Sequence, residues 1–260
     1  MPISLPILNV QPVSPVVPLT DPPTLSVVGS PWLTIQGEGP FAGTRAVFVR
    51  LAGCNLRCPT CDTDYTSDAK DTDIEYLGAQ VYDAMIGEGK WYDAIGSDGR
   101  KVLANRSVVV ITGGEPMRQE ALVPFVRHLI LDYGLSVQIE TNGTLGLEDL
   151  PWMSDRLSVV VSPKSSYIHP LIREYATAYK FVVTADKIDT VRGLPTAVLG
   201  RPVNFTFDML GDISRRQIYI QPEDVQDDEQ NAKNLKAALW VVETFGYRLS
   251  VQTHKMIGVP

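Results

Sequence analysis

Short runs of apolar, mostly β-branched residues recur along the chain from residue 46 onward and predict a series of strands. These runs occupy residues 46–51, 107–112, 136–140, 157–162, 179–184, 216–221 and 248–253. Several of them are apolar almost throughout, which is typical of strands that are covered on both faces. We therefore expect a sheet that lies inside the protein.

Three longer segments repeat apolar residues at helical spacing and predict helices over residues 71–86, 118–134 and 229–246. The second and third end on Gly134 and Gly246, a residue type that favours a helix stop. Pro124 should kink or shorten the second helix. The third helix should bury one apolar face, which consists of Leu235, Leu239, Val242 and Phe245.

The alternation of strands with helices indicates parallel βα units. Seven predicted strands and fewer helices favour an α/β fold, specifically an incomplete (partial) TIM-type βα barrel, over eight full units. The length of 260 residues is long for an ordinary single domain but normal for one such barrel.

Residues 1–30 differ from the rest of the chain, because they contain seven prolines and neither Lys nor Arg. This composition predicts an extended arm or a disordered leader. Such an arm is either a tail without function or a segment that wraps a partner. We expect the catalytic domain to follow over residues 31–260.

The composition limits the possible partners. The chain is 44% apolar and 20% charged, and its formal net charge is −7. An acidic protein is a poor generic ligand for a phosphate backbone, so we expect no nucleic-acid binding. We expect no membrane segment, because no apolar run approaches the roughly 20 residues that a membrane helix needs. The N-terminus lacks the basic start of a secretory signal, and with three cysteines this predicts a reducing, cytoplasmic location.

All three cysteines, Cys54, Cys58 and Cys61, lie within eight residues in a C-x3-C-x2-C pattern. They follow the strand that ends near Leu51, and ligands collect at the carboxyl ends of strands in α/β sheets. A structural zinc ion would need four Cys or His ligands, and inert buried thiols are a further alternative. A [4Fe–4S] cluster held by three cysteines leaves one iron for a non-protein ligand, and the spacing favours this interpretation.

A second motif follows another predicted strand, at residues 111–116 with the sequence ITGGEP. The adjacent Gly113 and Gly114 would let a ligand approach the backbone closely. The cysteine spacing and this motif together resemble the radical S-adenosylmethionine (SAM) superfamily. The resemblance implies that the open iron chelates SAM, and that one electron from the cluster releases a 5′-deoxyadenosyl radical.

Further segments narrow the resemblance to the 7-carboxy-7-deazaguanine synthase (QueE) family. They cover residues 34–65, 111–116, 140–144, 162–164, 219–222 and 252–260. The resemblance implies a lyase that contracts the ring of 6-carboxy-5,6,7,8-tetrahydropterin to 7-carboxy-7-deazaguanine with loss of ammonia. This reaction belongs to 7-deazapurine biosynthesis of the queuosine type, and it implies a [4Fe–4S] cluster, SAM and Mg²⁺.

The resemblance assigns residues to the pterin and to SAM. The residues implied for the substrate are Ile35, Gln36, Gly37, Glu38, Arg50, Thr112 and Pro260. The residues implied for SAM are Thr60, Cys61, Asp62, Gly114, Glu115, Ser162, Pro163, Lys164, Gln221, Pro222, Glu223 and Asp224. Arg50 also stands out without the resemblance, because a charge in an apolar strand needs an anion, either a substrate carboxylate or a local Asp or Glu.

The resemblance also implies that Thr63 binds Mg²⁺ and that the C-terminal Pro260 reaches back to the substrate. His254, near that end, is expected to be a hydrogen-bonded structural histidine. An electron donor such as flavodoxin and a homodimer are expected from the resemblance. Two rival functions remain at this point: a radical SAM activase that acts on a protein glycine, and a non-catalytic zinc or iron–sulfur module.

Overall fold

The computed structural model describes residues 9–86 and 107–259. Seven strands of the described residues run parallel in one sheet. They are β3 (Arg45–Leu51), β5 (Ser107–Gly113), β6 (Ser136–Thr141), β7 (Leu157–Val161), β8 (Ala178–Val183), β13 (Gln217–Pro222) and β14 (Arg248–Leu249). All seven predicted strands are therefore confirmed, although the last is only two residues long.

Three antiparallel strands extend the sheet beyond β3, and the sequence analysis missed them. They are β1 (Thr24–Val28), β2 (Trp32–Ile35) and β4 (Ala69–Asp73). β1 lies within the expected arm, yet Leu25 and Val27 are part of the core. The domain that we expect to begin at residue 31 stays a prediction, but the sheet itself already includes β1.

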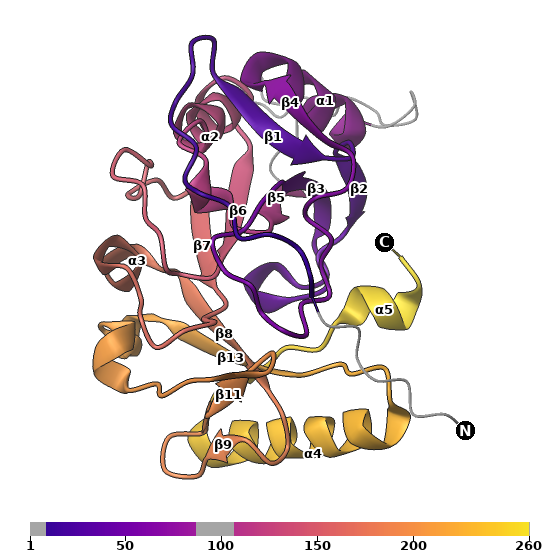
Figure 1. The fold of residues 1–260 in the computed structure, drawn as a ribbon, viewed down its shortest axis with the longest axis vertical. Helices are drawn as coiled ribbons and strands as arrows, with labels where there is room; N and C mark the ends of the chain where they lie inside the picture. Colours follow the sequence, from indigo (N-terminus) through magenta and orange to yellow (C-terminus); the bar gives the residue numbers. More distant parts are fainter. Residues whose placement is uncertain (1–8, 87–106, 260) are drawn as a thin grey trace, which may run out of the picture.

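The strand order is β14-β13-β8-β7-β6-β5-β3-β1-β4, with β2 beside β3. Figure 1 shows how the sheet follows the chain, from the indigo and purple strands at the top to the orange β13 at the bottom. Within the described residues β14 and β4, at the two ends, are not paired with each other. The sheet is thus an open α/β barrel, as predicted.

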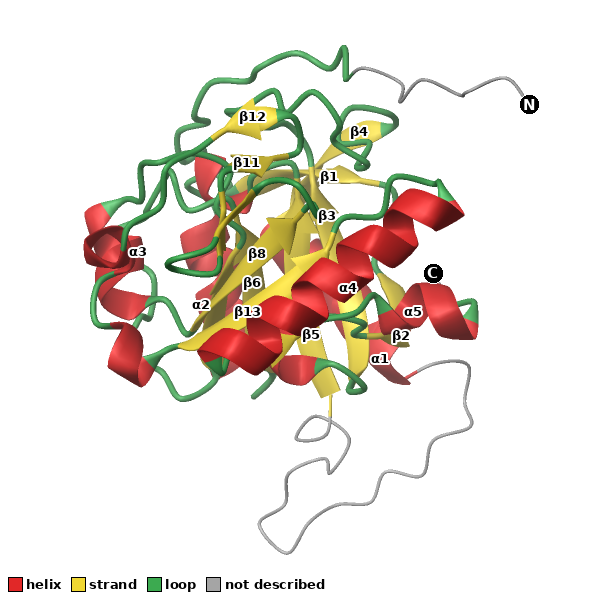
Figure 2. Cartoon of the chain, turned by 90° about the horizontal axis from the view of Figure 1, so that it is seen from below, coloured by secondary structure: helices red, strands yellow, loops and turns green. Residues whose placement is uncertain are grey.

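Four helices cover the sheet: α1 (Ile74–Ile86), α2 (Leu122–Leu131), α3 (Pro170–Tyr175) and α4 (Asp228–Phe245). Figure 2 shows α4 crossing β13 obliquely, with α2 and α3 at another side of the sheet. α1 begins later than predicted, because residues 71–73 belong to β4. α2 is shorter than predicted and has Pro124 in its first turn, where a proline breaks no helical hydrogen bond. A fifth helix, α5 (Thr253–Ile257), ends the described chain.

Several short elements complete the fold. They are the ribbons β9 (Ile188–Asp189) with β10 (Leu194–Pro195) and β11 (Ala197–Val198) with β12 (Arg201–Pro202), and the 3-10 helices Gly39–Phe41, Pro116–Arg118, Phe207–Leu210 and Ile213–Arg215.

The buried face of α4 agrees with the prediction at Val242 and Phe245, which pack against the core, but not at the two leucines. Leu235 and Leu239 are 39% and 40% exposed, whereas Asn234, Ala238 and Val241 are fully buried. The Asn234 side chain donates to the Glu223 backbone oxygen and accepts from the Ala185 N–H. Because Asn234 is buried with satisfied hydrogen bonds, the buried face of α4 is shifted by about one residue from the face that apolar spacing predicts.

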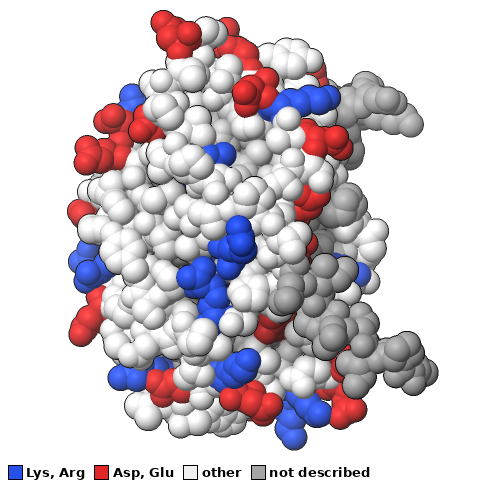
Figure 3. Space-filling model, viewed as in Figure 1, with Lys and Arg blue, Asp and Glu red and all other residues white. Residues whose placement is uncertain are grey.

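The main apolar core lies between the sheet and its helices, whereas the opposite face of the sheet carries only small apolar groups around Val108 and Val160. No helix of the described residues is both long enough and apolar enough to cross a bilayer. On the face in Figure 3, acidic and basic side chains are interspersed among a larger uncharged surface.

The helix α2 offers a matched pair of leucines for testing the core. Leu129 is fully buried and Leu131 is 75% exposed. We expect Leu129→Ala to lower the free energy of unfolding by about 2–5 kcal/mol, because it leaves a cavity, and Leu131→Ala to change it by less than about 0.5 kcal/mol. Urea unfolding measures both. Equal effects would contradict the placement of α2 on the sheet.

Candidate active site

One cavity of about 380 Å³ lies at the carboxyl ends of the parallel strands. Most of the residues that the resemblance implied line it. They are Ile35, Gln36, Glu38, Arg50, Cys54, Cys58, Thr60, Cys61, Asp62, Thr63, Thr112, Gly114, Ser162, Lys164, Gln221, Pro222, Glu223 and Asp224. Gly37, Glu115 and Pro163 do not line the cavity, and Pro260 lies outside the described residues. Residues far apart in the sequence are thus brought to one place.

The cysteine loop, residues 52–65, leaves the end of β3 and borders the cavity. Cys54 and Cys58 are buried and Cys61 is half-buried, and all three are free thiols. The loop has almost no regular structure, so surrounding groups hold it. The Gly53 N–H donates to the Tyr65 oxygen at 2.9 Å, which closes the loop on itself.

The two glycines of the second motif let the end of β5 pack against this loop. A Cβ at Gly113, where φ is +140°, would lie 2.0 Å from the Leu51 oxygen, and a Cβ at Gly114 would lie 2.2 Å from the Gly53 oxygen. The Glu115 N–H donates to the same Gly53 oxygen at 2.9 Å. The close approach that the sequence indicates is therefore made, in this structure, by backbone at the end of β3 and in the cysteine loop.

Glu115 is fully buried beneath the cavity. Its carboxylate accepts from the Met117 N–H at 3.0 Å, the Thr141 hydroxyl at 2.7 Å and the Asn142 N–H at 2.7 Å. Burial raises the pKa of Glu115, although these hydrogen bonds act in the opposite direction. The side chain braces β5 against the end of β6, and its implied contact with SAM stays a prediction.

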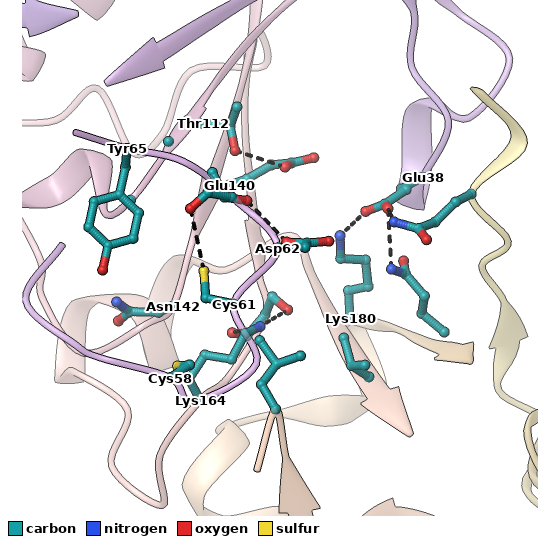
Figure 4. A pocket seen from close by; sticks show the side chains of 18 of the residues that line it. Glu38, Cys58, Cys61, Asp62, Tyr65, Thr112, Glu140, Asn142, Lys164 and Lys180 are labelled. Atoms are coloured by element: carbon teal, nitrogen blue, oxygen red, sulfur yellow. Dashed lines mark hydrogen bonds and ion pairs between the residues drawn. The ribbon is translucent and has the colours of Figure 1, made fainter. Parts of the chain in front are cut away.

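Glu38 forms a buried ion pair with Lys180 (Figure 4). The other carboxylate oxygen accepts from Gln252 at 2.8 Å and from Gln221 at 3.2 Å. Burial alone would raise the pKa of Glu38, but the Lys180 charge lowers it to about 2. Burial likewise opposes the charge on Lys180, yet Glu38 raises the pKa of Lys180. Both groups are therefore charged at neutral pH. Lys180 was not predicted as a site residue.

Glu140 is a second acidic group that the sequence analysis missed. Its carboxylate accepts from Gln36 at 3.0 Å, from Gln138 at 3.1 Å and from Thr112 at 3.2 Å, and it lines the cavity (Figure 4). It lies near the end of β6 and is the first residue of the family segment 140–144. Its position in an otherwise apolar strand was the available signal, the same signal that singled out Arg50.

Arg50 points from β3 into the cavity. Its guanidinium lies 5.4 Å from the ring centroid of Trp32, a cation–π contact. The buried Nε atom has no hydrogen-bond partner among the described residues. The alternative of a local Asp or Glu partner therefore finds no support, and a buried donor facing a cavity is suited to an anionic ligand.

Lys164 is half-buried on the side of the cavity that faces the cysteines. Its ammonium donates to the Ser162 backbone oxygen at 2.9 Å and to the Ser162 hydroxyl. Burial, with a smaller effect of the Lys180 charge, lowers the pKa of Lys164 to about 8. The group is still largely protonated at neutral pH, so the cavity wall carries a cation here.

The residues on both sides of the third cysteine add polar groups to the cavity wall, and Thr60, just before it, contacts the end of β13. The Thr60 hydroxyl donates to Glu223 at 3.4 Å, and the Thr63 hydroxyl donates to Asp62 at 3.1 Å. Asp224 pairs with Lys255 at 2.6 Å, which lowers the pKa of Asp224 to about 2. These hydroxyl and carboxylate oxygens are the polar part of this wall.

The C-terminal segment closes the cavity opposite the cysteines. Gln252, His254 and Lys255 line it, and Thr253 donates to the Gly37 oxygen through its N–H at 3.2 Å and its hydroxyl at 3.1 Å. A Cβ at Gly37 would lie 2.0 Å from the His254 Nδ1 atom. The absence of a side chain at Gly37 therefore lets α5 pack closely against this segment. His254, which we expected to be a structural histidine, lines the cavity.

The three thiols border one cavity without forming a preformed site for a single metal ion among the described residues. In the part of the chain that the structure describes, no three His, Cys, Asp or Glu side chains are grouped to hold one metal ion. The zinc alternative, which needs four such ligands at one centre, has no preformed site there. A cluster instead presents separate iron atoms to separate thiols, and all three cysteines border the same space.

Comparison with known proteins identifies the family. No family model matches the chain. It is 38% identical over 231 residues to the 7-carboxy-7-deazaguanine synthase of Rhodospirillum rubrum, a match that covers 87% of this chain and 89% of that protein. It is 33% identical over 237 residues to the enzyme of the same name from Rickettsia prowazekii, covering 89% of this chain and 88% of that protein.

A solved structure agrees with these sequence matches. The crystal structure of QueE from Escherichia coli superimposes with a TM-score of 0.58 at 25% sequence identity, and the match covers 87% of this chain and 93% of that chain. The partial barrel and the sequence matches lead to one conclusion. The chain belongs to the 7-carboxy-7-deazaguanine synthase family of radical SAM enzymes.

Proposed function

We propose that the cavity holds 6-carboxy-5,6,7,8-tetrahydropterin beside a [4Fe–4S] cluster and SAM, and that the chain converts this pterin to 7-carboxy-7-deazaguanine with loss of ammonia. One observation carries the proposal. The three cysteines, Arg50 and the segment of Gln36 and Glu38 line the same cavity. The names of the relatives support the same reaction.

The cysteine side of the cavity is the proposed cofactor side. When bound, the cluster and SAM supply the radical that removes a hydrogen atom from the substrate. Cys54, Cys58 and Cys61 are the proposed cluster ligands. The Lys164 ammonium and the Ser162 hydroxyl can bind a carboxylate or a ribose hydroxyl of SAM. The other polar groups proposed for SAM are Thr60, Asp62, Gly114, Gln221, Glu223 and Asp224.

The opposite side is the proposed pterin side. The unpartnered Nε of Arg50 suits the substrate carboxylate, because a charged donor binds an anionic acceptor strongly. Glu140 accepts three hydrogen bonds from the protein and has further acceptor capacity for the guanidine-like edge of the pterin. Glu38, kept ionised by Lys180, can only accept, so it suits another ring N–H.

Apolar side chains between these two sides keep the cavity dry. The aromatic and aliphatic lining residues include Trp32, Phe48, Val160, Val182 and Leu199. A site that excludes water strengthens its polar contacts and protects a reactive radical from side reactions.

Further parts of the proposal rest on the family alone. Mg²⁺ is proposed to bind the Thr63 hydroxyl together with the substrate carboxylate, since magnesium takes few protein ligands. The C-terminal Pro260 is proposed to reach the substrate. An electron donor such as flavodoxin, a homodimer and a place in 7-deazapurine biosynthesis of the queuosine type complete the proposal.

Reconstitution and turnover test the proposed function. The anaerobically reconstituted protein should bind about four irons per chain and, with SAM, reductant, Mg²⁺ and the carboxypterin, should form the deazapurine. Cys58→Ala should lose most of the iron and all turnover. Metal analysis and chromatography give both results. One zinc per chain in place of iron, or SAM cleavage without deazapurine, would reject the assignment.

Arg50→Gln tests the substrate side separately. Losing a charge-assisted hydrogen bond should raise KM for the carboxypterin about 10- to 100-fold. Iron content should stay at the wild-type value. Arg127→Gln is the matched control, because Arg127 lies on α2 and donates to the Asp149 oxygen, away from the cavity. Unchanged steady-state kinetics in Arg50→Gln would exclude Arg50 from substrate binding.

The Glu38–Lys180 pair predicts a pH dependence of stability. The pKa of Glu38 is lower in the folded protein than in the unfolded chain, so its ionisation stabilises the fold above the ordinary carboxyl pKa. That contribution is lost as the pH falls from about 4.5 towards about 2. Urea unfolding of the apo-protein at several pH values in this window measures the free energy of unfolding, which should depend less on pH in Glu38→Gln/Lys180→Met than in the wild type. The same pH dependence in both proteins would contradict a stabilising Glu38–Lys180 pair.

A further inference from the structure

The N-terminal arm follows a three-residue repeat. Prolines stand at positions 12, 15 and 18, and the residue before each one, Gln11, Ser14 or Val17, faces the protein while its neighbours are exposed. A proline holds the preceding residue extended, and an extended polyproline chain repeats every three residues. The arm therefore presents one polar edge to the protein, and its prolines, which have no N–H, stand on the exposed side.

This edge binds the cysteine loop directly. Four backbone oxygens of the loop accept from the arm. The Ser14 N–H donates to the Cys54 oxygen at 2.7 Å, and the Asn9 N–H donates to the Pro59 oxygen at 2.8 Å. The Asn9 side chain donates to the Cys58 oxygen at 3.1 Å. The fourth contact comes from Gln11.

Gln11 bridges two points of the loop with one side chain. Its amide nitrogen donates to the Thr63 oxygen at 2.9 Å, and its amide oxygen accepts from the Tyr65 N–H at 2.8 Å. The side-chain amide thus makes the donor and acceptor bonds that the backbone of a paired strand would otherwise make. Asn9 also lines the cavity beside the cysteines, so the arm reaches the site itself.

The loop has few internal bonds that could replace these contacts. Within residues 52–65 of the described chain, two backbone hydrogen bonds join loop residues: from the Gly53 N–H to the Tyr65 oxygen at 2.9 Å, and from the Cys61 N–H to the Cys58 oxygen at 3.3 Å. The Leu56 N–H also donates to the Cys54 sulfur at 3.4 Å. A segment with so few contacts of its own opens easily unless neighbours hold it.

We propose that Asn9 and Gln11 are positioning residues that clamp the cysteine loop, so that its thiols face the cavity before any cluster is bound and release iron slowly afterwards. The first part, the position of the thiols, is a property of the apo-protein and does not depend on the proposed function. Only the second part, slow iron release, rests on the proposed function of the loop as a cluster site.

Thiol reactivity of the apo-protein tests the clamp. Gln11→Leu removes both bridging hydrogen bonds and should raise the iodoacetamide alkylation rates of Cys58 and Cys61 about fivefold or more, because the loop then opens more often. Asn9→Ala, a second variant, should act in the same direction. Gln11→Glu keeps the acceptor for the Tyr65 N–H but loses the donor, so its rates should be intermediate. Peptide mass spectrometry gives the rate at each cysteine.

Gln217→Leu is the matched control. Gln217 stands at the opposite, amino end of β13, and its side chain also accepts one hydrogen bond, from the Tyr219 hydroxyl at 2.5 Å. This control should alkylate at the wild-type rate, and all variants should react equally in denaturing urea. Wild-type rates in both Gln11→Leu and Asn9→Ala would overturn the clamp. Unfolding of both variants as a whole would also overturn it, because the arm would then belong to the global core.

Iron release tests the second part. After reconstitution, Gln11→Leu should lose iron to a chelator several-fold faster than wild type and Gln217→Leu, with the same iron content at the start. Electron paramagnetic resonance of the reduced protein follows the loss. Equal release rates would overturn this part. Failure of the wild-type protein to take up iron would instead reject the proposed function and leave the apo-protein result standing.

Discussion

The position of the cysteine loop depends on hydrogen bonds from its neighbours, because the loop leaves β3 without a helix or strand of its own. From below, Arg118 and Gln119 donate to the Ala52 oxygen at 3.0 and 3.2 Å, and the Glu115 N–H donates to the Gly53 oxygen. From outside, the N-terminal arm takes four more loop oxygens. Buried polar groups that satisfy one another in this way specify a single arrangement, and here that arrangement turns three thiols towards one cavity.

The cavity separates charges into two regions. Lys164 is a cation that faces the cysteines, whereas the Glu38–Lys180 pair is joined to the C-terminal segment through Gln252. Lys180 neutralises Glu38 where water is scarce, and a paired buried charge is far less costly than a single one. Arg50 lies in another part of the cavity wall, and its Nε has no hydrogen-bond partner among the residues that the structure describes. This division fits the two proposed ligands, which need different groups: a cofactor beside the thiols and a carboxylated ring beside Arg50.

The sequence predicted the parallel strands because a buried strand is a local run of apolar residues, which can be recognised without knowing its partner strand. It also located Arg50, since a lone charge in such a run is visible without a structure. The same signal was present at Lys180 and Glu140, which stand in similar runs, and it was not used. The ionic partner of Lys180, 142 residues away, is visible only in the folded chain. The sequence analysis missed β1 for another reason: prolines on its N-terminal side made the whole segment resemble a free arm. Only folding reveals that the arm spans the cysteine loop.

The central claim is that the three thiols hold a cluster with one iron left open for SAM. Electron–nuclear double resonance on the reduced, reconstituted protein tests it most directly, with SAM labelled by ¹⁷O in its carboxylate and ¹⁵N in its amino group. The account predicts hyperfine coupling of both labels to the cluster, since both atoms would bind the open iron. A reduced cluster with bound SAM but without coupling to either label would contradict it.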